Sequence, residues 1–524
     1  MEEYKTLFIV YFIGLSFIFF SSLATYYIFI KYPKNASINT GNYIFFSSLL
    51  FYIVSIIYLS FGKIDALHHY VDFATHLEIL WRFSNGFGLT TLMSEDYHNG
   101  SHWFAAHFTP IIYLTYAPIF KIFPYTQTIT IAETIFILSS LIPLWLISRK
   151  YLDDNLTKIF ISSFLFYPTI FYTNLYGIAY IELCIPLFLW LFYFFEEKKF
   201  FAFTFVLFLI LMTREEVSLV IIFFGFWILL KKKYLLGFFT SSIGLAYFYF
   251  AFFIAIPHFN NGNPHMATSL FDNYGNSLTE IIIYIFYNPL NILKEVFILP
   301  KIGNFVMIFA PILFIPFLNL STTMIALPNL AVTFLSASIT HSSYILYYIS
   351  PTIPILFYSI ISSLNLKRKI YVLKKGALIY ALFIATLTST VFFGATPISL
   401  AYWFKDYKVG KFYTTNFHRS AYVEEDKDRI AKKIVELIPK NAVVSAEQHF
   451  TPLLYKHKKM IVFPSPQSEI EYVLIDRYNP KKTGGYYKNT LRTNPEAEYQ
   501  KYIHNKNWLI IKEQLGIILF KKVN

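Results

Sequence analysis

Acidic and histidine side chains gather in the segment that follows the second long apolar run of the chain. His68, Asp72 and His76 are four residues apart, so a helix here would place all three on one face. Such a face could bind a divalent cation such as Mg²⁺ or Mn²⁺, or present the Asp72 carboxylate to a substrate. An amphipathic helix at the membrane interface explains the same pattern without any chemistry. We expect a functional role for Asp72, and the metal site stays open as an alternative.

Three consecutive ionisable residues, Arg214, Glu215 and Glu216, join two other apolar runs with almost no linker. Charged side chains between membrane segments are costly unless they face protein or a water-filled cavity. The planar guanidinium of Arg214 suits a phosphate group, which it can bind through two parallel hydrogen bonds. The simple alternative is an Arg–Glu pair that satisfies itself in a tight turn. We expect at least one of the three side chains to line a polar site.

Four further residues at the ends of apolar runs are candidates for the same site. Glu182 and His107 each begin an apolar run, and His341 and Tyr344 lie at another boundary. Charged and aromatic residues are also common at membrane boundaries for reasons of hydration and packing alone. We expect these four to help bind a substrate if the loops that carry them meet on one side of the membrane.

Long apolar runs must position these residues, because they make up most of the chain up to about residue 394. Many approach or reach the roughly 20 residues that a helix needs to cross a bilayer, among them 7–30, 43–61, 129–148, 238–256 and 378–394. Of the 524 residues, 56% are hydrophobic and only 14% are charged, which excludes an ordinary soluble protein. We therefore predict a polytopic α-helical membrane protein with roughly 12 to 13 spans.

Basic clusters beside the apolar runs indicate the orientation of the chain. Loops rich in Lys and Arg, such as 231–233 and 367–369, face the cytoplasm. The candidate residues then emerge on the external side of the cell (plasma) membrane. The net charge of +13 is explained by these clusters, so no nucleic-acid partner is expected. Residues 107–124 are apolar but short and contain Pro110 and Pro118, which favours a re-entrant or interfacial hairpin.

The chain divides into four predicted parts. These are N-terminal membrane helices (1–61), an external loop with juxtamembrane helices (62–106), a polytopic membrane domain (107–394) and an external soluble domain (395–524). The last part is more polar, and its patterns predict helices at 426–437, 451–455 and 495–504 and strands at 442–445, 460–463, 471–476, 508–511 and 515–520. It reads as a small α/β domain on the membrane surface.

The order of the motifs resembles a known family. Asp72 lies in a Val-Asp-Phe-Ala-x-x-Leu-x-x-Leu-Trp run, which is followed by His107-Phe108-x-Pro110, Glu182, Arg214-Glu215-Glu216 and His341-x-x-Tyr344. This order is similar to that of the uncharacterised prokaryotic membrane family called domain of unknown function 2079. That family in turn resembles the GT-C glycosyltransferases. Those enzymes share an acidic residue in the first large external loop and take sugars from polyprenyl-phosphate donors.

The resemblance implies a GT-C-like fold and an integral-membrane glycosyltransferase of the cell envelope. The implied partners are a polyprenyl-phosphate sugar donor, membrane lipids, and a glycan, lipid or protein acceptor on the external face. Asp72 would be the catalytic base, Arg214 would neutralise the leaving phosphate, and the other candidates would bind substrate. The chain departs from the family where Leu77 replaces a second Asp and where Arg214 replaces a Lys. The missing Asp weakens a two-carboxylate metal site.

Two other classes of protein remain open. A secondary transporter also keeps ionisable residues at membrane depth, but it should show inverted repeats and broken helices near the midplane, and the sequence shows neither. A non-catalytic assembly or scaffold protein is the other class. Convergence of Asp72, Glu182 and Arg214 in one cavity would favour the enzyme over both.

Overall fold

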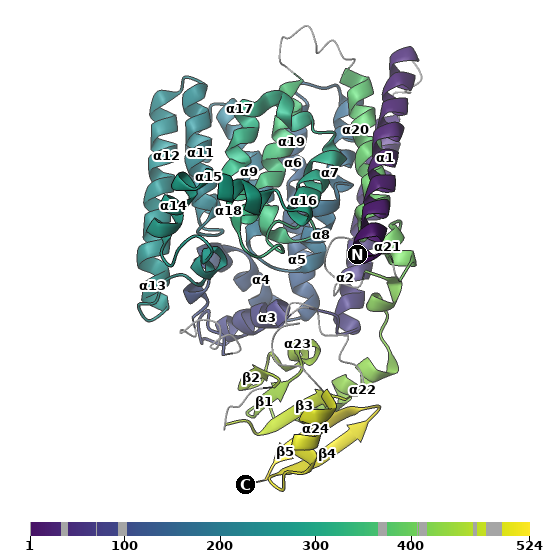
Figure 1. Cartoon of the computed structure of the whole chain (residues 1–524), viewed down its shortest axis with the longest axis vertical. Coiled ribbons are helices and arrows are strands. Elements are labelled where there is room, and N and C mark those ends of the chain that lie inside the picture. The colour runs from purple at the N-terminus through teal and green to yellow at the C-terminus, as the bar shows by residue number, and fades with distance from the viewer. Residues whose placement is uncertain are drawn as a thin grey trace.

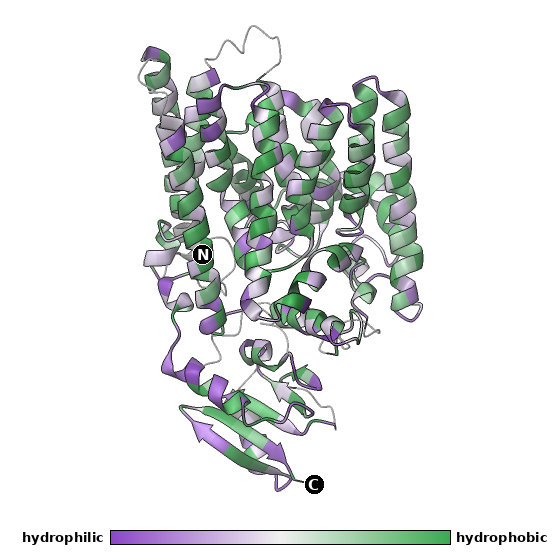
Figure 2. Cartoon of the chain, turned by 180° about the vertical axis from the view of Figure 1, so that it is seen from behind, coloured by the Kyte–Doolittle hydropathy of each residue, from purple (hydrophilic) through white to green (hydrophobic). Residues whose placement is uncertain are grey.

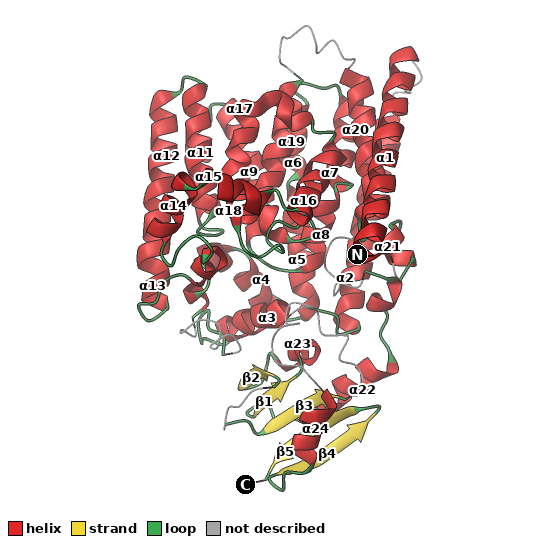
Figure 3. Cartoon of the chain, in the orientation of Figure 1, coloured by secondary structure: helices red, strands yellow, loops and turns green. Residues whose placement is uncertain are grey.

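The structure is a computed structural model that describes residues 2–32, 40–69, 71–92, 102–364, 375–405, 407, 417–464, 469–477 and 495–523. A bundle of helices forms most of the molecule, and the strands lie together beyond one end of the bundle (Figures 1 and 3). Hydrophobic residues dominate the bundle helices, whereas hydrophilic residues gather at the helix ends and around the strands (Figure 2). The chain is a multi-pass membrane protein with a small C-terminal α/β region, which confirms the predicted fold class.

Six segments within the described residues are helical, long and apolar enough to cross a membrane, and a bent pair raises the number to seven. They lie in α1 (Glu2–Lys31), in α2 (Thr40–Asp65), in α5 and α6 (Thr126–Ser139, Leu141–Ser148), in α12 to α13 (Tyr234–Tyr249, Ile256–Phe259), in Ile315–Leu335 with α17 (Leu320–Thr323) and α18 (Leu327–Leu335), and in α20 (Lys375–Phe393). The bent pair is α15 (Pro289–Val296) with Leu299–Ile312, which begins with α16 (Leu299–Phe309).

The number of long spans is lower than the roughly twelve to thirteen predicted. Several apolar runs fold into shorter helices, and a 14-residue helix covers only about 21 Å. These helices are α7 (Asp154–Leu165), α8 (Pro168–Tyr176), α9 (Cys184–Glu196), α10 (Phe200–Leu211), α11 (Val217–Leu230), α14 (Leu278–Tyr287) and α19 (Thr352–Ser363). Apolar composition alone therefore overstated how many segments cross the bilayer as single long helices.

The apolar run that contains α8 and α9 is broken where the site needs polar groups. Pro168 starts α8, and Gly177 ends it with a φ of 108°, a conformation that favours glycine. A Cβ at Gly177 would also lie 3.2 Å from the ring of Phe73. The chain then makes a short irregular turn before α9 begins at Cys184. This break places Glu182 inside the protein rather than on a lipid-facing helix.

The segment 107–124 contains no helix long enough to cross a bilayer. After the 3-10 turn Pro110–Leu114 it forms α4 (Tyr116–Ile122), which has seven residues and covers only about 10 Å. α4 packs beside α3 (Val71–Ser84) at the end of the bundle that faces the strands (Figure 1). The re-entrant or interfacial hairpin stays a prediction.

The C-terminal region contains one five-stranded sheet in the order β2-β1-β3-β5-β4. β1 (Val443–Ala446) pairs in parallel with β2 (Lys459–Val462) and β3 (Tyr472–Asp476), whereas β5 (Ile517–Lys522) pairs antiparallel with β3 and with β4 (Trp508–Gln514). The accompanying helices are α21 (Leu400–Trp403), α22 (Asp426–Val435), α23 (Thr451–Leu454) and α24 (Pro495–Ile503). Four of the five strands lie within one or two residues of the predicted positions, and β4 begins at the predicted residue but ends three residues later.

The C-terminal sheet region packs directly on α3. Val71 and Ala74 of α3 share a hydrophobic cluster with Phe450 and Leu454. In Figure 1 α3 lies between the bundle and α23. The first turn of α3 carries Asp72, so the C-terminal region supports the element that positions this carboxylate.

Candidate functional site

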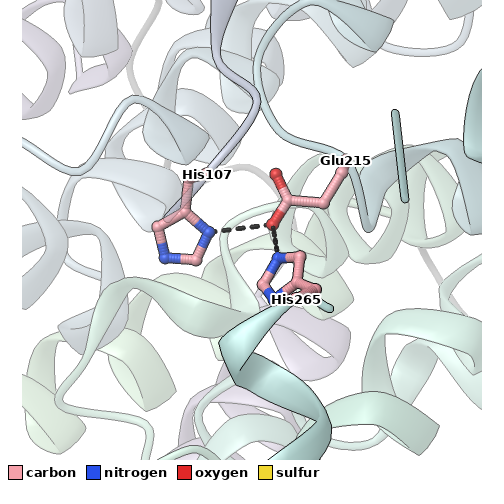
Figure 4. Close-up of side chains that lie close together, drawn as sticks. All are labelled: His107, Glu215 and His265. Carbon is pink, nitrogen blue, oxygen red and sulfur yellow. Dashed lines mark hydrogen bonds and ion pairs between the residues drawn. The ribbon is translucent and has the colours of Figure 1, made fainter. Parts of the chain in front are cut away.

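Glu215 lies in the turn between α10 and α11 and binds side chains from two distant segments. His107 Nδ1 is 2.8 Å and His265 Nε2 is 2.7 Å from the same carboxylate oxygen, Oε1. The backbone N–H of Phe108 donates to Oε2 at 2.9 Å. Figure 4 shows the two imidazole rings converging on this carboxylate. Glu215 is thus a buried hub that ties three loops together.

The hydrogen bonds around the hub define which imidazole nitrogens carry protons. A guanidinium can only donate, so the 2.8 Å contact with Arg214 Nη2 makes His107 Nε2 the acceptor and leaves the proton on Nδ1. His265 Nδ1 accepts from the N–H of Ala267 at 2.8 Å, which leaves its proton on Nε2. Both histidines therefore donate to Glu215. Burial would raise the pKa of Glu215, but His107 and His265 outweigh it and hold that pKa well below its usual range.

His107, Glu215 and His265 are the one group of described residues whose ligand atoms have metal-binding spacing, within 4.8 Å of one another. A metal ion would need lone pairs on His107 Nδ1 and His265 Nε2. The neighbouring donors, Arg214 and Ala267, place protons on these two nitrogens. In this hydrogen-bonding arrangement the group does not fit a metal ion.

The predicted metal ligands around Asp72 do not form such a group either. α3 begins at Val71, so His68 precedes the helix and the four-residue spacing does not apply to it. His76 lies on α3, but its Nδ1 is 3.2 Å from the hydroxyl of Tyr180. Burial, His107 and Arg214 lower the pKa of His76 to about 3, so it is neutral. Its contacts are those of a packed core histidine.

Arg214 is a buried cation held between acidic and aromatic groups. Its Nε is 3.0 Å from Glu216 Oε1, and its guanidinium lies 5.8 Å from the ring centre of Tyr347 and 6.0 Å from that of Tyr348. Burial lowers the pKa of Arg214, but Glu216 and its other neighbours outweigh this and raise it. The side chain therefore stays charged and is fixed in direction.

Asp72 is linked to this cation through Tyr176 and Tyr347. The hydroxyl of Tyr176 donates to Asp72 Oδ2 at 2.6 Å, and the ring of Tyr176 meets that of Tyr347 edge to face at 4.6 Å. Tyr347 in turn packs against Arg214. Burial raises the pKa of Asp72, while Tyr176 and the charge of Arg214 oppose the rise. Asp72 and Arg214 thus belong to one connected site.

The remaining candidates, His341, Tyr344 and Glu182, make contacts of different kinds. The ring of His341 lies tilted beside that of Tyr348, with the ring centres 4.2 Å apart. Burial together with Arg214 and His107 lowers the pKa of His341 to about 4. Tyr344 packs edge to face on Tyr172 in the hydrophobic core of the bundle. Glu182 accepts a hydrogen bond from Tyr116 at 2.7 Å, and burial raises the pKa of Glu182 to about 7.

Several residues of the site carry no clear signal in the sequence. His265 lies in a long loop with other polar residues, and nothing local marks it as a partner of Glu215. Tyr176 and Tyr347 are two of 42 tyrosines. Glu133 was identifiable, because it is an ionisable residue inside the apolar run 129–148, whereas Lys63 lies two residues beyond the run 43–61.

A family model described as "Predicted membrane protein (DUF2079)" matches residues 65–519. The chain belongs to this family. No curated protein matches the DUF2079 chain. Solved structures similar to it include ArnT from Cupriavidus metallidurans bound to undecaprenyl phosphate, with 11% identity, a TM-score of 0.49 and coverage of 90% of this chain and 97% of that one. The Archaeoglobus fulgidus oligosaccharyltransferase has 11% identity, a TM-score of 0.34 and coverage of 82% and 69%.

Proposed function

We propose that this DUF2079 protein is an integral-membrane glycosyltransferase that moves a sugar from a polyprenyl-phosphate donor to an acceptor on the external face of the membrane. One observation carries the proposal: a buried carboxylate, Asp72, and a buried, permanently charged guanidinium, Arg214, interact electrostatically and are linked through Tyr176 and Tyr347. Glycosyl transfer from a phosphate needs a base at the acceptor and a cation at the leaving group.

Asp72 is suited to take the acceptor proton. The acceptor hydroxyl forms a bond to the anomeric carbon of the sugar, and its proton passes to the Asp72 carboxylate. Tyr176 holds Oδ2 in place, and burial brings the pKa of Asp72 closer to neutral, where a general base works best. The bond from the anomeric carbon to the phosphate oxygen breaks, and the polyprenyl phosphate leaves with the electron pair.

Arg214 is suited to bind the departing phosphate. His107 and Glu216 contact its guanidinium at 2.8 and 3.0 Å and fix its orientation. Glu215 accepts a hydrogen bond from His107 and so orients the imidazole that contacts Arg214. A cation already oriented in a low-dielectric site stabilises a leaving anion without reorganising during the reaction. Of the remaining candidates, His341 would bind sugar or acceptor.

The proposed external orientation agrees with the arrangement of the helices. The turn between α11 and α12, which contains Lys231, Lys232 and Lys233, lies at the end of the bundle opposite α3 (Figure 1). Lysine-rich turns face the cytoplasm, so α3 and the C-terminal region would face outside. The second basic cluster, at 367–369, lies outside the described residues.

A transfer assay with matched variants tests the proposal. Purified protein in lipid would be given polyprenyl-phosphate sugars and candidate acceptors, and mass spectrometry would follow the lipid-linked sugar. Asp72→Asn should lower turnover by about 10²–10⁴-fold while donor binding persists, because the amide cannot accept the proton. Arg214→Ala should weaken donor binding by about 2–5 kcal/mol.

The controls make the same substitutions at an exposed pair. Asp426 and Arg429 are 2.6 Å apart, and their side chains are 80% and 54% exposed. Asp426→Asn and Arg429→Ala should leave transfer unchanged. Full activity in Asp72→Asn would remove its role as the base, and unchanged donor affinity in Arg214→Ala would leave that residue a structural ion pair.

A further inference from the structure

A second cluster of ionisable side chains lies inside the bundle, apart from Asp72 and Arg214. Glu133 comes from α5, Lys63 from α2, and Glu182 from the short turn Ile181–Leu183 that precedes α9. Their exposed fractions are 0%, 7% and 1%. Glu182 and Lys63 are the charged groups that act most strongly on Glu133. Three elements thus bring two carboxyl groups and one ammonium group together in the interior.

Glu133 differs from the other two because its carboxyl oxygens make no hydrogen bond with any residue that the structure describes. Lys63 Nζ donates to the carbonyl of Leu175 at 2.9 Å, and Glu182 accepts from the hydroxyl of Tyr116 at 2.7 Å. Glu133 lies seven residues into the segment Thr126–Ser148, about 10 Å along the helix. An ionised carboxylate without a partner is strongly disfavoured at such a depth.

The charges of the cluster do not balance by themselves. Glu133 and Glu182 contribute two negative charges, and Lys63 contributes one positive charge. Among the described residues, the phenols of Tyr52 and Tyr116 also interact electrostatically with Glu133, and a phenol is neutral at pH 7. Arg214 also acts on Glu182, but two carboxylates of its own turn, Glu215 and Glu216, already offset its charge. One bound proton brings the cluster to zero net charge.

A proton is also the ligand that fits the available space. Glu133 has no exposed surface and Glu182 almost none, so neither a sugar nor a hydrated ion has access to the pair. We propose that Glu133, Glu182 and Lys63 form a buried proton-binding site in which one of the two carboxyl groups carries a proton at neutral pH. The raised pKa of Glu182, to about 7 through burial, agrees with a carboxyl group that retains a proton there. This site is independent of whether the protein transfers sugars.

Infrared spectroscopy of the full chain in lipid at pH 7 tests this site. The wild type should show the carbonyl stretch of a protonated carboxylic acid, with the expected shift in D₂O. Glu133→Gln and Glu182→Gln should each lose this component, because the remaining carboxylate is balanced by Lys63. Lys63→Met should instead increase it, to about twice the wild-type intensity, because both carboxyl groups must then be neutral.

Difference spectra between the wild type and each variant separate this component from other protonated carboxyl groups such as that of Asp72. Asp426→Asn, at an exposed carboxylate, should leave the spectrum of protonated acids unchanged. The proposal is overturned if the wild type lacks the component, or if both glutamine variants retain it. A decrease in Lys63→Met would also contradict it, and this variant provides a test even if a glutamine variant does not fold.

Discussion

Burial, the hydroxyl of Tyr176 and the charge of Arg214 together shift the pKa of Asp72. Burial raises the pKa of this carboxyl, and the hydrogen bond from Tyr176 lowers it by stabilising the ionised form. A base must be ionised to accept a proton, so the group works above its pKa and fails below it. The hydroxyl of Tyr176 therefore sets the lower pH limit of the proposed reaction.

Replacing Tyr176 by Phe should move this limit upward. Loss of a hydrogen bond to a charged group is worth about 1.5–3 kcal/mol, which corresponds to about 1–2 pKa units. The acid limb of the pH–activity profile should shift to higher pH by that amount, with little change at high pH. Tyr407→Phe is the matched control, because its hydroxyl donates to the carbonyl of Phe392, away from Asp72. An unshifted acid limb would show that Asp72 is not the titrating base.

Glu215 should contribute to stability as well as to orientation. In Glu215→Gln the amide NH₂ meets either the N–H of Phe108 or the two imidazole donors, so one donor loses its acceptor. We expect a loss of about 1–3 kcal/mol in the free energy of unfolding. Thermal unfolding, with the exposed Glu436→Gln as control, measures it.

The pH dependence of this contribution has a definite sign. The pKa of Glu215 is lowered in the folded protein, so its stabilisation is complete above the usual value of 4.5 and is lost as the pH falls below it. The wild type should lose stability on acidification, and Glu215→Gln should lose less. Equal slopes for the two proteins would contradict the proposed hub.

At the scale of elements, the contact between α2 and the C-terminal region depends on a glycine. The 3-10 turn Arg419–Tyr422 packs on α2 at Gly62, where an added Cβ would lie 2.5 Å from the carbonyl oxygen of Tyr422. Real Cβ atoms do not approach backbone oxygen so closely, so any side chain must push the turn away. The same region supports α3 and its Asp72.

Gly62→Val should loosen the C-terminal region without unfolding the bundle. Limited proteolysis should cleave residues 417–523 faster than in the wild type, while circular dichroism retains the helical signal. Gly303→Ala is the matched control, because nothing lies within 4 Å of an added Cβ there, and it should be neutral or slightly stabilising. Unchanged proteolysis in Gly62→Val would show that this contact does not hold the region in place.

At the scale of the whole molecule, the lysine-rich turn and the sheet region lie at opposite ends of the bundle (Figure 1). The chain has a single, buried cysteine, Cys184, so labelling can be made specific. On a Cys184→Ala background, a membrane-impermeant maleimide should label Glu436→Cys in intact cells. Lys233→Cys should react only after the membrane is opened. Labelling of Lys233→Cys alone in intact cells would reverse the proposed orientation. Labelling of both variants in intact cells would exclude it.

Properties that depend on residues close together along the chain could be predicted from the sequence. Apolar runs of bilayer length predicted a multi-pass membrane protein, because hydrocarbon thickness sets helix length. Alternating patterns and turns predicted the five C-terminal strands, because side chains alternate along a strand. The order of motifs from Asp72 onward predicted the family. Asp72, His107 and Arg214 stood out because ionisable groups at membrane boundaries need partners.

Only the tertiary structure decided which of these residues meet. Glu215 and His265 are 50 positions apart, and Lys63 acts electrostatically on Glu133 from a different helix. No local pattern encodes such contacts, because they result from how α2, α5 and the turns beside α11 pack together. The structure also separated His68 from α3 and divided several apolar runs into short helices, because proline, glycine and buried polar groups end helices that composition alone would continue.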